Sequence, residues 1–348
     1  MAICQTCGFC LASPGPRPAD LERYHAEGLT GHKGIDLPYS VEARISVLER
    51  YSVPGGLFAE IGGDAPGEFH LRCAPLFGQQ LVVEIADDTP AELRSVHGLA
   101  ENSIDVLAHY DVLEHVVEAR DFLAACQRAL RPGGVMVCEI PDLRMYPRNL
   151  LLLEFEHVNH FSITTLNYLA RQVGLNLIEV GHTCSRPYGL LAVFRKEPLP
   201  TSAPHDGRGE YFDALACVQG GLVQIRRVES QIEDVRQKIM DLGNAGKKVT
   251  LWAVTDIMRR LLAGFSLPAS VIVVDADPRR KTHLAQEGVV VEQPKDAIGH
   301  IADSELLVIC AARYQASILD WVRLECGVAF SGSRLAVLGA GPSGETLT

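Results

Sequence analysis

The stretch DVLAHYDVLEHVVEARDFLAACQRALRPGGVMVCEIP, residues 105–141, decides the fold class of this chain. Its first four residues, 105–108, are largely apolar and predict a short strand. Apolar residues then recur at helical spacing between 122 and 130, which predicts a helix with one buried face. The Arg-Pro-Gly-Gly sequence at 131–134 should end that helix, because proline cannot continue it, and 135–140 predicts the next strand. This succession is typical of a parallel α/β sheet, in which ligands bind beyond the carboxyl ends of the strands.

The same stretch resembles the core of class I S-adenosylmethionine (SAM)-dependent methyltransferases. The resemblance rests on an aspartate before a short strand, the sequence DVLEHV, a helix and the sequence LRPGG. It implies an α/β fold with a Rossmann-like class I methyltransferase sheet, and SAM as the cofactor. His109 and Tyr110 follow the first strand, so we expect them to border the cofactor cleft. We expect Glu114 and His115 to start and steady the following helix.

Composition narrows the class of protein and its partners. A chain of 348 residues is long enough for two domains, and 47% hydrophobic and 22% charged residues are globular values. The net charge of −11 argues against a nucleic-acid partner, because phosphate binding requires a basic surface. No apolar run is long enough for a membrane helix, so no membrane partner is expected. The first residues lack the pattern of a secretory signal, and ten cysteines then indicate cytoplasmic thiols.

The N-terminal segment, residues 1–52, contains Cys4, Cys7 and Cys10 at a spacing of C-x2-C-x2-C. A Cys-x-x-Cys turn is a usual half of a zinc site, because its two thiolates point toward one ion. The stretch resembles the second half of the zinc ribbon that opens a group of sugar C-methyltransferases. Further zinc ligands would have to be Cys10, His25, His32 or a residue from elsewhere. The alternative is a turn with free thiols.

Residues 53–196 form the predicted SAM-binding domain. A strand at 57–61 runs into a loop in which Asp64-Ala65-Pro66 replaces the middle glycine of the methyltransferase pattern. Glycines there let the backbone pass close to the methionine and ribose parts of SAM. An acid after the second strand would accept both ribose hydroxyls, although Asp87 also suits a plain helix-start turn. The cofactor contacts that the resemblance implies are Glu60, Gly62, Gly63, Gly67, Asp87, Leu99 and Ala100.

The sequence EFEHVNHFS at 154–162 carries the predicted chemistry. It resembles the deoxysugar C-methyltransferases, in which a Tyr-His-Glu-His run surrounds the sugar and helps remove a proton. Glu156 and His157 match that run, whereas Glu154 stands in place of the tyrosine. We therefore expect His157 to be the base, with Glu156 as its partner or in the exchanged role. The alternative is that His157 only packs at the start of the helix predicted at 164–173.

The second half divides into residues 197–245 and 246–348. The first part combines a linker with a long amphipathic helix at 218–242, whose apolar face packs in a core or forms a homodimer. The second part alternates strands and helices, which predicts a second Rossmann-like α/β domain. It resembles the substrate-side C-terminal domain of the same C-methyltransferases, but residues 253–256 lack a glycine loop. That absence argues against a second dinucleotide site.

These features predict a SAM-dependent methyltransferase that methylates a carbon atom of a sugar-like or other natural-product intermediate. The expected partner is a small-molecule substrate. One alternative is an enzyme that uses SAM without methyl transfer, for instance in aminocarboxypropyl chemistry, because the loop at 63–66 is altered. The other is a non-catalytic binding or scaffold protein, because the cysteine motif and both glycine loops are incomplete.

Overall fold

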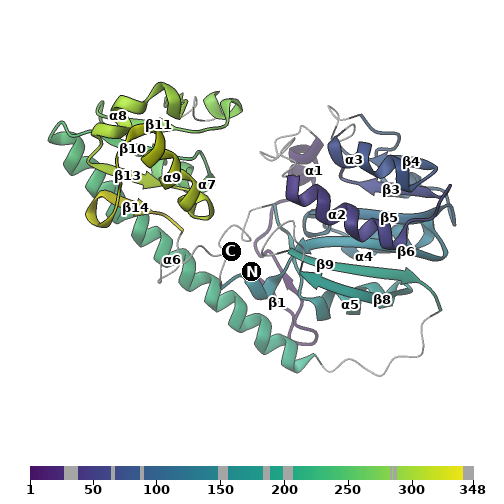
Figure 1. Ribbon diagram of the computed structural model, residues 1–348. Helices are drawn as coiled ribbons and strands as arrows, with labels where there is room; N and C mark the ends of the chain where they lie inside the picture. The colour runs from purple at the N-terminus through teal and green to yellow at the C-terminus, as the bar shows by residue number, and fades with distance from the viewer. Residues whose placement is uncertain are drawn as a thin grey trace. The chain divides into compact units, whose positions relative to one another are not determined.

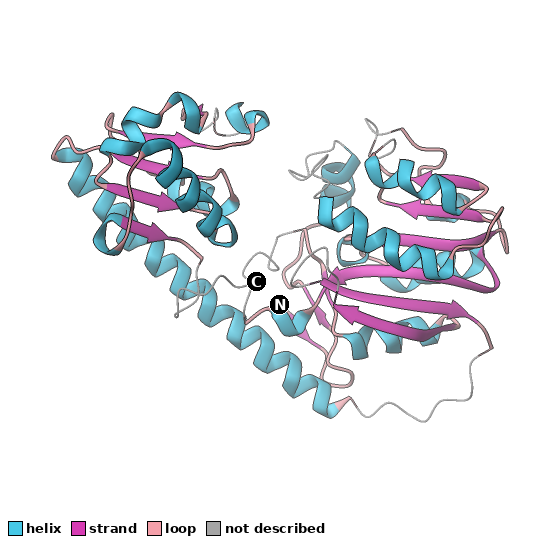
Figure 2. Ribbon diagram, viewed as in Figure 1, coloured by secondary structure: helices cyan, strands magenta, loops and turns pink. Residues whose placement is uncertain are grey.

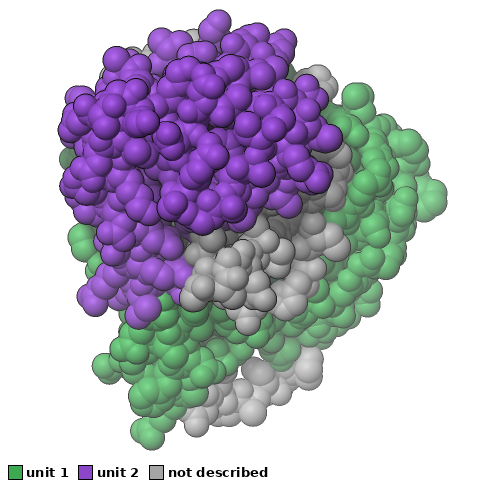
Figure 3. All heavy atoms as spheres, turned by 60° about the vertical axis from the view of Figure 1, so that its left-hand side comes forward, with its two compact units in different colours: residues 1–220 green, residues 221–348 purple. Residues whose placement is uncertain are grey.

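The chain forms two compact units, residues 1–220 and 221–348, which are coloured separately in Figure 3. The computed structural model describes residues 1–26, 38–63, 67–86, 90–147, 156–182, 189–198, 207–282, 284 and 288–339. Figure 2 shows that each unit combines a sheet with helices, so both halves have the expected α/β architecture. Across these ranges, no helix has the length and apolarity needed to cross a membrane.

The first unit is built on a six-stranded sheet in the order β4-β3-β5-β6-β9-β8. The central strands β4, β3, β5 and β6 are parallel, whereas β9 runs antiparallel to both β6 and β8. The carboxyl ends of the four parallel strands therefore meet at one edge, where ligands bind in such sheets. The strands are β3 (Leu57–Ile61), β4 (Gln79–Val83), β5 (Ile104–Tyr110), β6 (Leu130–Pro141), β8 (Leu175–His182) and β9 (Gly189–Lys196).

Helices cover both faces of this sheet (Figure 1). On one face α2 (Pro38–Tyr51) and α3 (Glu68–Cys73) share a core with Val106 and Ala108 of β5. On the other face α4 (Ala119–Ala129) and α5 (Ile163–Gln172) share a second core, which includes Leu107. Successive β5 residues thus enter opposite cores, as the two-residue period of a strand requires.

The decisive stretch folds as predicted, with two differences. The Arg-Pro-Gly-Gly sequence belongs to β6, and the pairing of β5 with β6 shifts register between Ile104 and Val106 to accommodate the extra residues. Glu114 and His115 lie in the 3-10 turn η3 (Leu113–His115), and α4 begins only at Ala119. The expectation that this Glu-His pair starts the helix was therefore wrong.

A small sheet ties the N-terminus to the middle of the first unit. Strands β1 (Ala2–Ile3), β2 (Cys10–Leu11) and β7 (Asn159–His160) form it, with Cys10 opposite His160. Helix α1 (Pro18–Ala26) follows β2 along the chain. Ser162 caps α5 through a reciprocal capping box with Thr165, which confirms the predicted start of that helix to within a residue.

The second unit contains a five-stranded parallel sheet in the order β12-β11-β10-β13-β14. The long helix α6 (Arg208–Asn244) starts earlier than predicted, and its residues Val228, Ile232, Val235 and Ile239 are buried. Those residues form a buried face of the helix, as expected for packing in a core. Formation of a homodimer stays a prediction. The other elements are β10 (Val249–Trp252), α7 (Asp256–Leu262), β11 (Val271–Val274), β12 (Val291–Glu292), α8 (Ile298–Asp303), β13 (Leu306–Ile309), α9 (Gln315–Cys326) and β14 (Leu335–Val337).

Short 3-10 turns connect several of these elements. Those not yet named are η1 (Ala74–Leu76), η2 (Val96–Gly98), η4 (Leu143–Met145), η6 (Pro278–Thr282), η7 (Pro294–Asp296), η8 (Ala312–Tyr314) and η9 (Gly332–Arg334). Within the first unit, η2 and η3 flank β5 in the sequence. Of the two, η2 precedes the start of β5 and η3 follows its end, and β5 is a central strand of the sheet.

Candidate active site

The loop that leaves β3 requires glycine at Gly62. Gly62 has φ +77°, and a Cβ atom there would lie 2.5 Å from Cγ2 of Val112. A Cβ atom at Gly63 would lie 2.7 Å from a carboxylate oxygen of Glu60, a residue that is 6% exposed. At Gly62 the left-handed backbone and the contact with Val112 both exclude a side chain, whereas at Gly63 the flexible end of Glu60 could shift. Gly67 follows at the N-cap of α3, and the loop's contact with SAM stays a prediction.

The end of β4 is organised by side chains that bind its own backbone. A carboxylate oxygen of Glu84 accepts a hydrogen bond from the amide of Ala86 at 2.8 Å, and Arg94 donates to the carbonyl of Ala86 at 2.6 Å. The predicted ribose acid, Asp87, lies outside the described residues. Sequence reasoning missed Arg94, because its partners are backbone carbonyls, which leave no residue-type signal.

The predicted adenine contacts differ in accessibility. Leu99, which caps the end of η2, is 4% exposed, whereas Ala100 is exposed. The exposed fraction of Leu99 is small because it packs in the core beneath α4. Neither position is tested as a cofactor contact, so both stay predictions.

His109 and Tyr110 lie at the end of β5 but pack into opposite cores. His109 is 0% exposed, stacks edge-on against Phe122 at 5.3 Å, and its burial lowers its pKa to about 3. Tyr110 is 6% exposed, contacts the ring of Phe69 edge-on at 5.5 Å, and its burial raises its pKa well above the usual value. The structure therefore places His109 inside the α4 core, with no exposed surface for a cofactor.

Arg44 of α2 organises the strand ends beside Tyr110. Its guanidinium lies 4.2 Å from the centre of the Tyr110 ring and 3.6 Å from carboxylate oxygens of both Asp111 and Glu139. Asp111 has φ +55°, a conformation that a non-glycine residue rarely adopts and that often marks a functional turn. The sequence did not indicate Arg44, because its helix, α2, is separated from β5 and β6 along the chain by β3, β4 and the segments between them.

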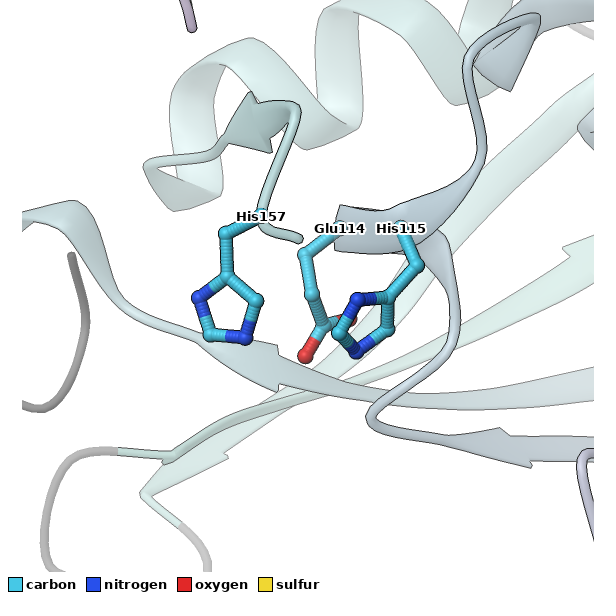
Figure 4. Close-up of side chains that lie close together, drawn as sticks. All are labelled: Glu114, His115 and His157. Carbon is cyan, nitrogen blue, oxygen red and sulfur yellow. The ribbon is translucent and has the colours of Figure 1, made fainter. Parts of the chain in front are cut away.

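Three titratable side chains meet beyond this turn and form what we term the Glu–His cluster: Glu114, His115 and His157. Their ligand-type atoms all lie within 4.8 Å of one another, and Figure 4 shows them extending side by side from two separate segments. The two imidazole rings meet edge to face, with centroids 4.9 Å apart. Glu114 is 2% exposed and His157 is 7% exposed. Such a buried group of imidazoles and a carboxylate is suited to proton transfer or metal binding.

Backbone and side-chain hydrogen bonds hold the two segments of the cluster together. The amide of Val158 donates to the carbonyl of Glu114 at 2.9 Å, and the side-chain amide of Asn159 donates to the carbonyl of Val116 at 2.6 Å. The pairing of β7 with β2 holds the same segment from its other side. His157 is therefore positioned by main-chain contacts on both sides.

Glu156 and His25 lie around the cluster. The carbonyl of Glu156 is 3.2 Å from Nδ1 of His115, and its side chain belongs to a residue that is 6% exposed. The ring of His25, on α1, lies 5.1 Å from the ring of His115. Burial lowers the pKa of His25, and the nearby Glu156 carboxylate partly opposes that shift. The third predicted catalytic residue, Glu154, lies outside the described residues.

The segment that leads into the cluster contacts the glycine loop. Val112, whose side chain fills the space that a Cβ atom at Gly62 would need, lies two residues before Glu114. A molecule that binds along Gly62 and Gly63 therefore lies next to the turn that carries Glu114 and His115. The sequence predicted both halves of this site, but it assigned Glu114 and His115 to a helix start.

The cysteine motif is arranged differently from a closed metal site. The pKa of Cys4 is lowered by hydrogen bonds from the backbone of Thr6 and Cys7 and from the Cys7 thiol, whereas burial raises that of Cys7. Cys10 is fully buried, and its thiol lies 3.6 Å from the carbonyl of Gly8. Among the described residues these cysteines do not form a group of three with converging ligand atoms. Zinc at this motif stays a prediction.

Comparison with known proteins identifies the type of domain. Residues 17–180 match the family model of a methyltransferase domain. The chain is 31% identical over 113 residues to a ubiquinone biosynthesis O-methyltransferase of Roseobacter denitrificans, covering 30% of this chain and 44% of that protein. It is 38% identical over 60 residues to the protein of the same name from Maricaulis maris, covering 15% and 24%. The chain thus spans less than half the length of these relatives.

A solved structure is also similar to about half of this chain. The 1,6-didemethyltoxoflavin-N1-methyltransferase of Burkholderia thailandensis, crystallised with its substrate and S-adenosylhomocysteine, is 13% identical. The similarity covers 54% of this chain and 95% of that chain, with a TM-score of 0.41. The strand order and the family match agree with the predicted fold class. The first unit has the Rossmann-like fold of methyltransferases, and residues 17–180 are the part of the chain that matches the methyltransferase family model.

Proposed function

We propose that this protein is a SAM-dependent methyltransferase that transfers a methyl group to a carbon atom of a sugar-like or other natural-product intermediate. The observation that carries the proposal is the position of the Glu–His cluster. It follows β5, at the edge where parallel α/β sheets bind their ligands, and the segment that leads into it contacts the glycine loop after β3. The family match over residues 17–180 supports methyl transfer as the reaction.

His157 is the proposed base. Carbon methylation needs a nucleophilic carbon, which forms when a base removes a proton beside a carbonyl group. The imidazole of His157 takes that proton, and the electron pair left on carbon forms the new bond to the methyl group. The old bond from methyl to sulfur breaks with its electrons moving to sulfur, so the charge of the sulfonium is lost. Glu156, or Glu114 within the cluster, stabilises the imidazolium that results.

Methylation of an oxygen atom is a second candidate. The relatives from Roseobacter denitrificans and Maricaulis maris are named O-methyltransferases. The same base would serve, because a hydroxyl group also has to lose its proton before it attacks a methyl group. The two candidates therefore differ in the substrate atom and not in the residues that surround it.

Methyl-labelled SAM distinguishes these candidates. The full-length protein is first titrated with SAM by calorimetry, and binding is expected. It is then incubated with [methyl-¹³C]SAM and a panel of keto-sugars and phenols, and the ¹³C shift of the product methyl group separates carbon from oxygen attachment. A methyl group on carbon supports the leading proposal, and a methoxy signal supports the second candidate.

Two other outcomes would overturn the proposal. Release of methylthioadenosine instead of S-adenosylhomocysteine would indicate that SAM is used without methyl transfer. The altered loop at 63–66 motivates this check, because it would contact the methionine end of the cofactor. Absence of SAM binding in the folded protein would leave a binding or scaffold role.

A further inference from the structure

We propose that Glu114, His115 and His157 bind one divalent transition-metal ion, with Zn²⁺ as the reference ion. Each residue offers one ligand atom, and these atoms all lie within 4.8 Å of one another. In a zinc site, ligand atoms about 2.0–2.2 Å from the ion lie somewhat closer together than this. Small side-chain rotations would therefore bring the three atoms onto one ion, without movement of the backbone.

The cluster is preorganised by its backbone. His115 and Glu114 are consecutive residues of η3, and His157 belongs to the segment whose Val158 amide donates to the Glu114 carbonyl at 2.9 Å. Figure 4 shows the three side chains extending in the same general direction. A site that is fixed before the ion arrives binds more tightly, because little conformational entropy is lost on binding.

A hydrogen bond sets the tautomer of His115. Its Nδ1 lies 3.2 Å from the carbonyl oxygen of Glu156, and a carbonyl can only accept, so Nδ1 carries the hydrogen. The lone pair of the ring is then on Nε2, the atom that would bind the ion in this proposal. Metal-bound histidines usually donate their other nitrogen to a carbonyl or carboxylate in this way, which fixes the ring and raises its basicity.

The ligand chemistry and the burial also fit a cation. Two imidazoles and one carboxylate make up a common catalytic set for zinc and for other divalent transition metals, and it leaves coordination positions for substrate. Glu114 is 2% exposed and His157 is 7% exposed, so two of the three proposed ligands lie in the interior. His25, with its ring 5.1 Å from that of His115, encloses the same group.

The ion would sharpen the proposed function, on which this last step rests. A cation with open positions beside the glycine loop would bind a carbonyl or hydroxyl oxygen of the substrate and acidify the neighbouring proton. His157 would then be a metal ligand, and Glu156 would take the proton in the exchanged role. The substrate class narrows to molecules with an oxygen on or next to the methylated atom.

Cobalt binding tests the site without any assay of activity. The full-length protein is stripped with a chelator and titrated with Co²⁺, followed by its visible absorption, and then with Zn²⁺ by calorimetry. In a variant that lacks the thiols of Cys4 and Cys7, one equivalent is expected, with a spectrum that lacks the charge-transfer band of cobalt–thiolate bonds. Glu114→Gln and His115→Ala should each weaken Zn²⁺ binding by at least tenfold, while the exposed His97→Ala should not.

The controls separate this site from the cysteines and from the proposed function. A Cys4→Ser/Cys7→Ser variant should keep the cobalt spectrum. Loss of binding in that variant, or unchanged affinity when Glu114→Gln is added to it, would overturn the metal proposal. Far-UV circular dichroism confirms that each variant is folded. SAM binding and product formation are measured separately, so failure of methyl transfer with intact Zn²⁺ binding would refute only the proposed function.

Discussion

The carboxyl ends of the parallel strands are followed by different kinds of loop in the two units of this chain. In the first unit, β3 runs into Gly62 and β5 runs into η3, so the edge carries a glycine loop and the Glu–His cluster. In the second unit, β10 is followed by Ala253, which has φ +77° and occupies a turn where glycine would be relaxed. The same strand architecture therefore ends in two different kinds of loop.

The second edge is filled by its own hydrogen bonds. Asp275, directly after β11, accepts from the amide of Val254 at 2.7 Å, and Gln293 donates to the carbonyl of Asp275 at 2.9 Å. Thr255 caps α7 and donates to the carbonyl of Cys310 at 2.8 Å. Polar side chains at this edge thus close the loops of the sheet. In the first unit, polar side chains from distant segments converge instead, and that convergence is the basis on which we place the proposed active site there.

Of the changes that separate the two edges, removal of His157 should have the largest effect, a loss of turnover. His157→Ala is expected to lower turnover by about 10²–10⁴-fold, the usual contribution of a positioned acid–base group. S-adenosylhomocysteine release with an accepted substrate measures the effect. His97→Ala, an exposed histidine of the same unit, is the matched control and should retain full turnover. Full activity of folded His157→Ala would remove the cluster from the mechanism.

Gly62→Ala should be more destabilising than the same change in another left-handed glycine. Gly62 and Gly133 have φ +77° and +79°, but only Gly62 has an atom, Cγ2 of Val112, within 4 Å of the new Cβ. Both variants gain backbone strain, and Gly62→Ala adds overpacking of about 1–3 kcal/mol. Urea unfolding of the first unit measures the difference, and equal losses of free energy would contradict the predicted clash.

Acidification should destabilise the first unit because His109 is buried as the neutral imidazole. Its pKa is about 3 in the folded chain, whereas a histidine in the unfolded chain has a pKa of about 6.5. Between these values the unfolded chain binds one more proton, so stability falls as the pH falls, by roughly 1.4 kcal/mol per pH unit. Above about pH 6.5 this penalty disappears.

His109→Leu tests this pH dependence. Between pH 7 and pH 5 the variant should lose about 2 kcal/mol less stability than the parent, measured by urea unfolding at both values. His160, which is buried against Tyr146 and also has its pKa lowered to about 3, keeps part of the acid sensitivity. His97→Leu is the matched control and should keep the slope of the parent. An unchanged slope in His109→Leu would show that other groups dominate.

Ala253→Gly should have the smallest effect, and it addresses the second edge directly. A left-handed conformation costs a non-glycine residue about 1–2 kcal/mol, and glycine recovers most of it but loses more entropy on folding. We therefore expect stabilisation of the second unit by about 1 kcal/mol or less, measured by urea unfolding. SAM affinity should stay unchanged. Tighter SAM binding in this variant would contradict the assignment of the functional edge to the first unit.

The sequence predicted most of the fold because its signals are local. The strand at 57–61 has the predicted bounds, since it is a largely apolar run that ends at a glycine. The start of α5 was predictable from Ser162, a capping residue. The helix pattern between 122 and 130 predicted the buried face of α4. The register shift in β6 was not predictable, because proline and glycines there equally suit a separate turn.

The candidate site was only half predictable, for a physical reason. Glu156 and His157 could be recognised because they belong to one continuous run, 154–162, that resembles a run of the deoxysugar C-methyltransferases. The loop after β3 could be recognised by its glycines. Glu114 and His115 carry a local signal that favours a helix start, and only the tertiary structure overrides it. Hydrogen bonds from the Val158 and Asn159 region to η3 bring residues far apart in the sequence into contact. Chain order and local propensity do not encode such pairings, so the sequence alone determined the two sheets, and tertiary packing decided which residues meet at their edges.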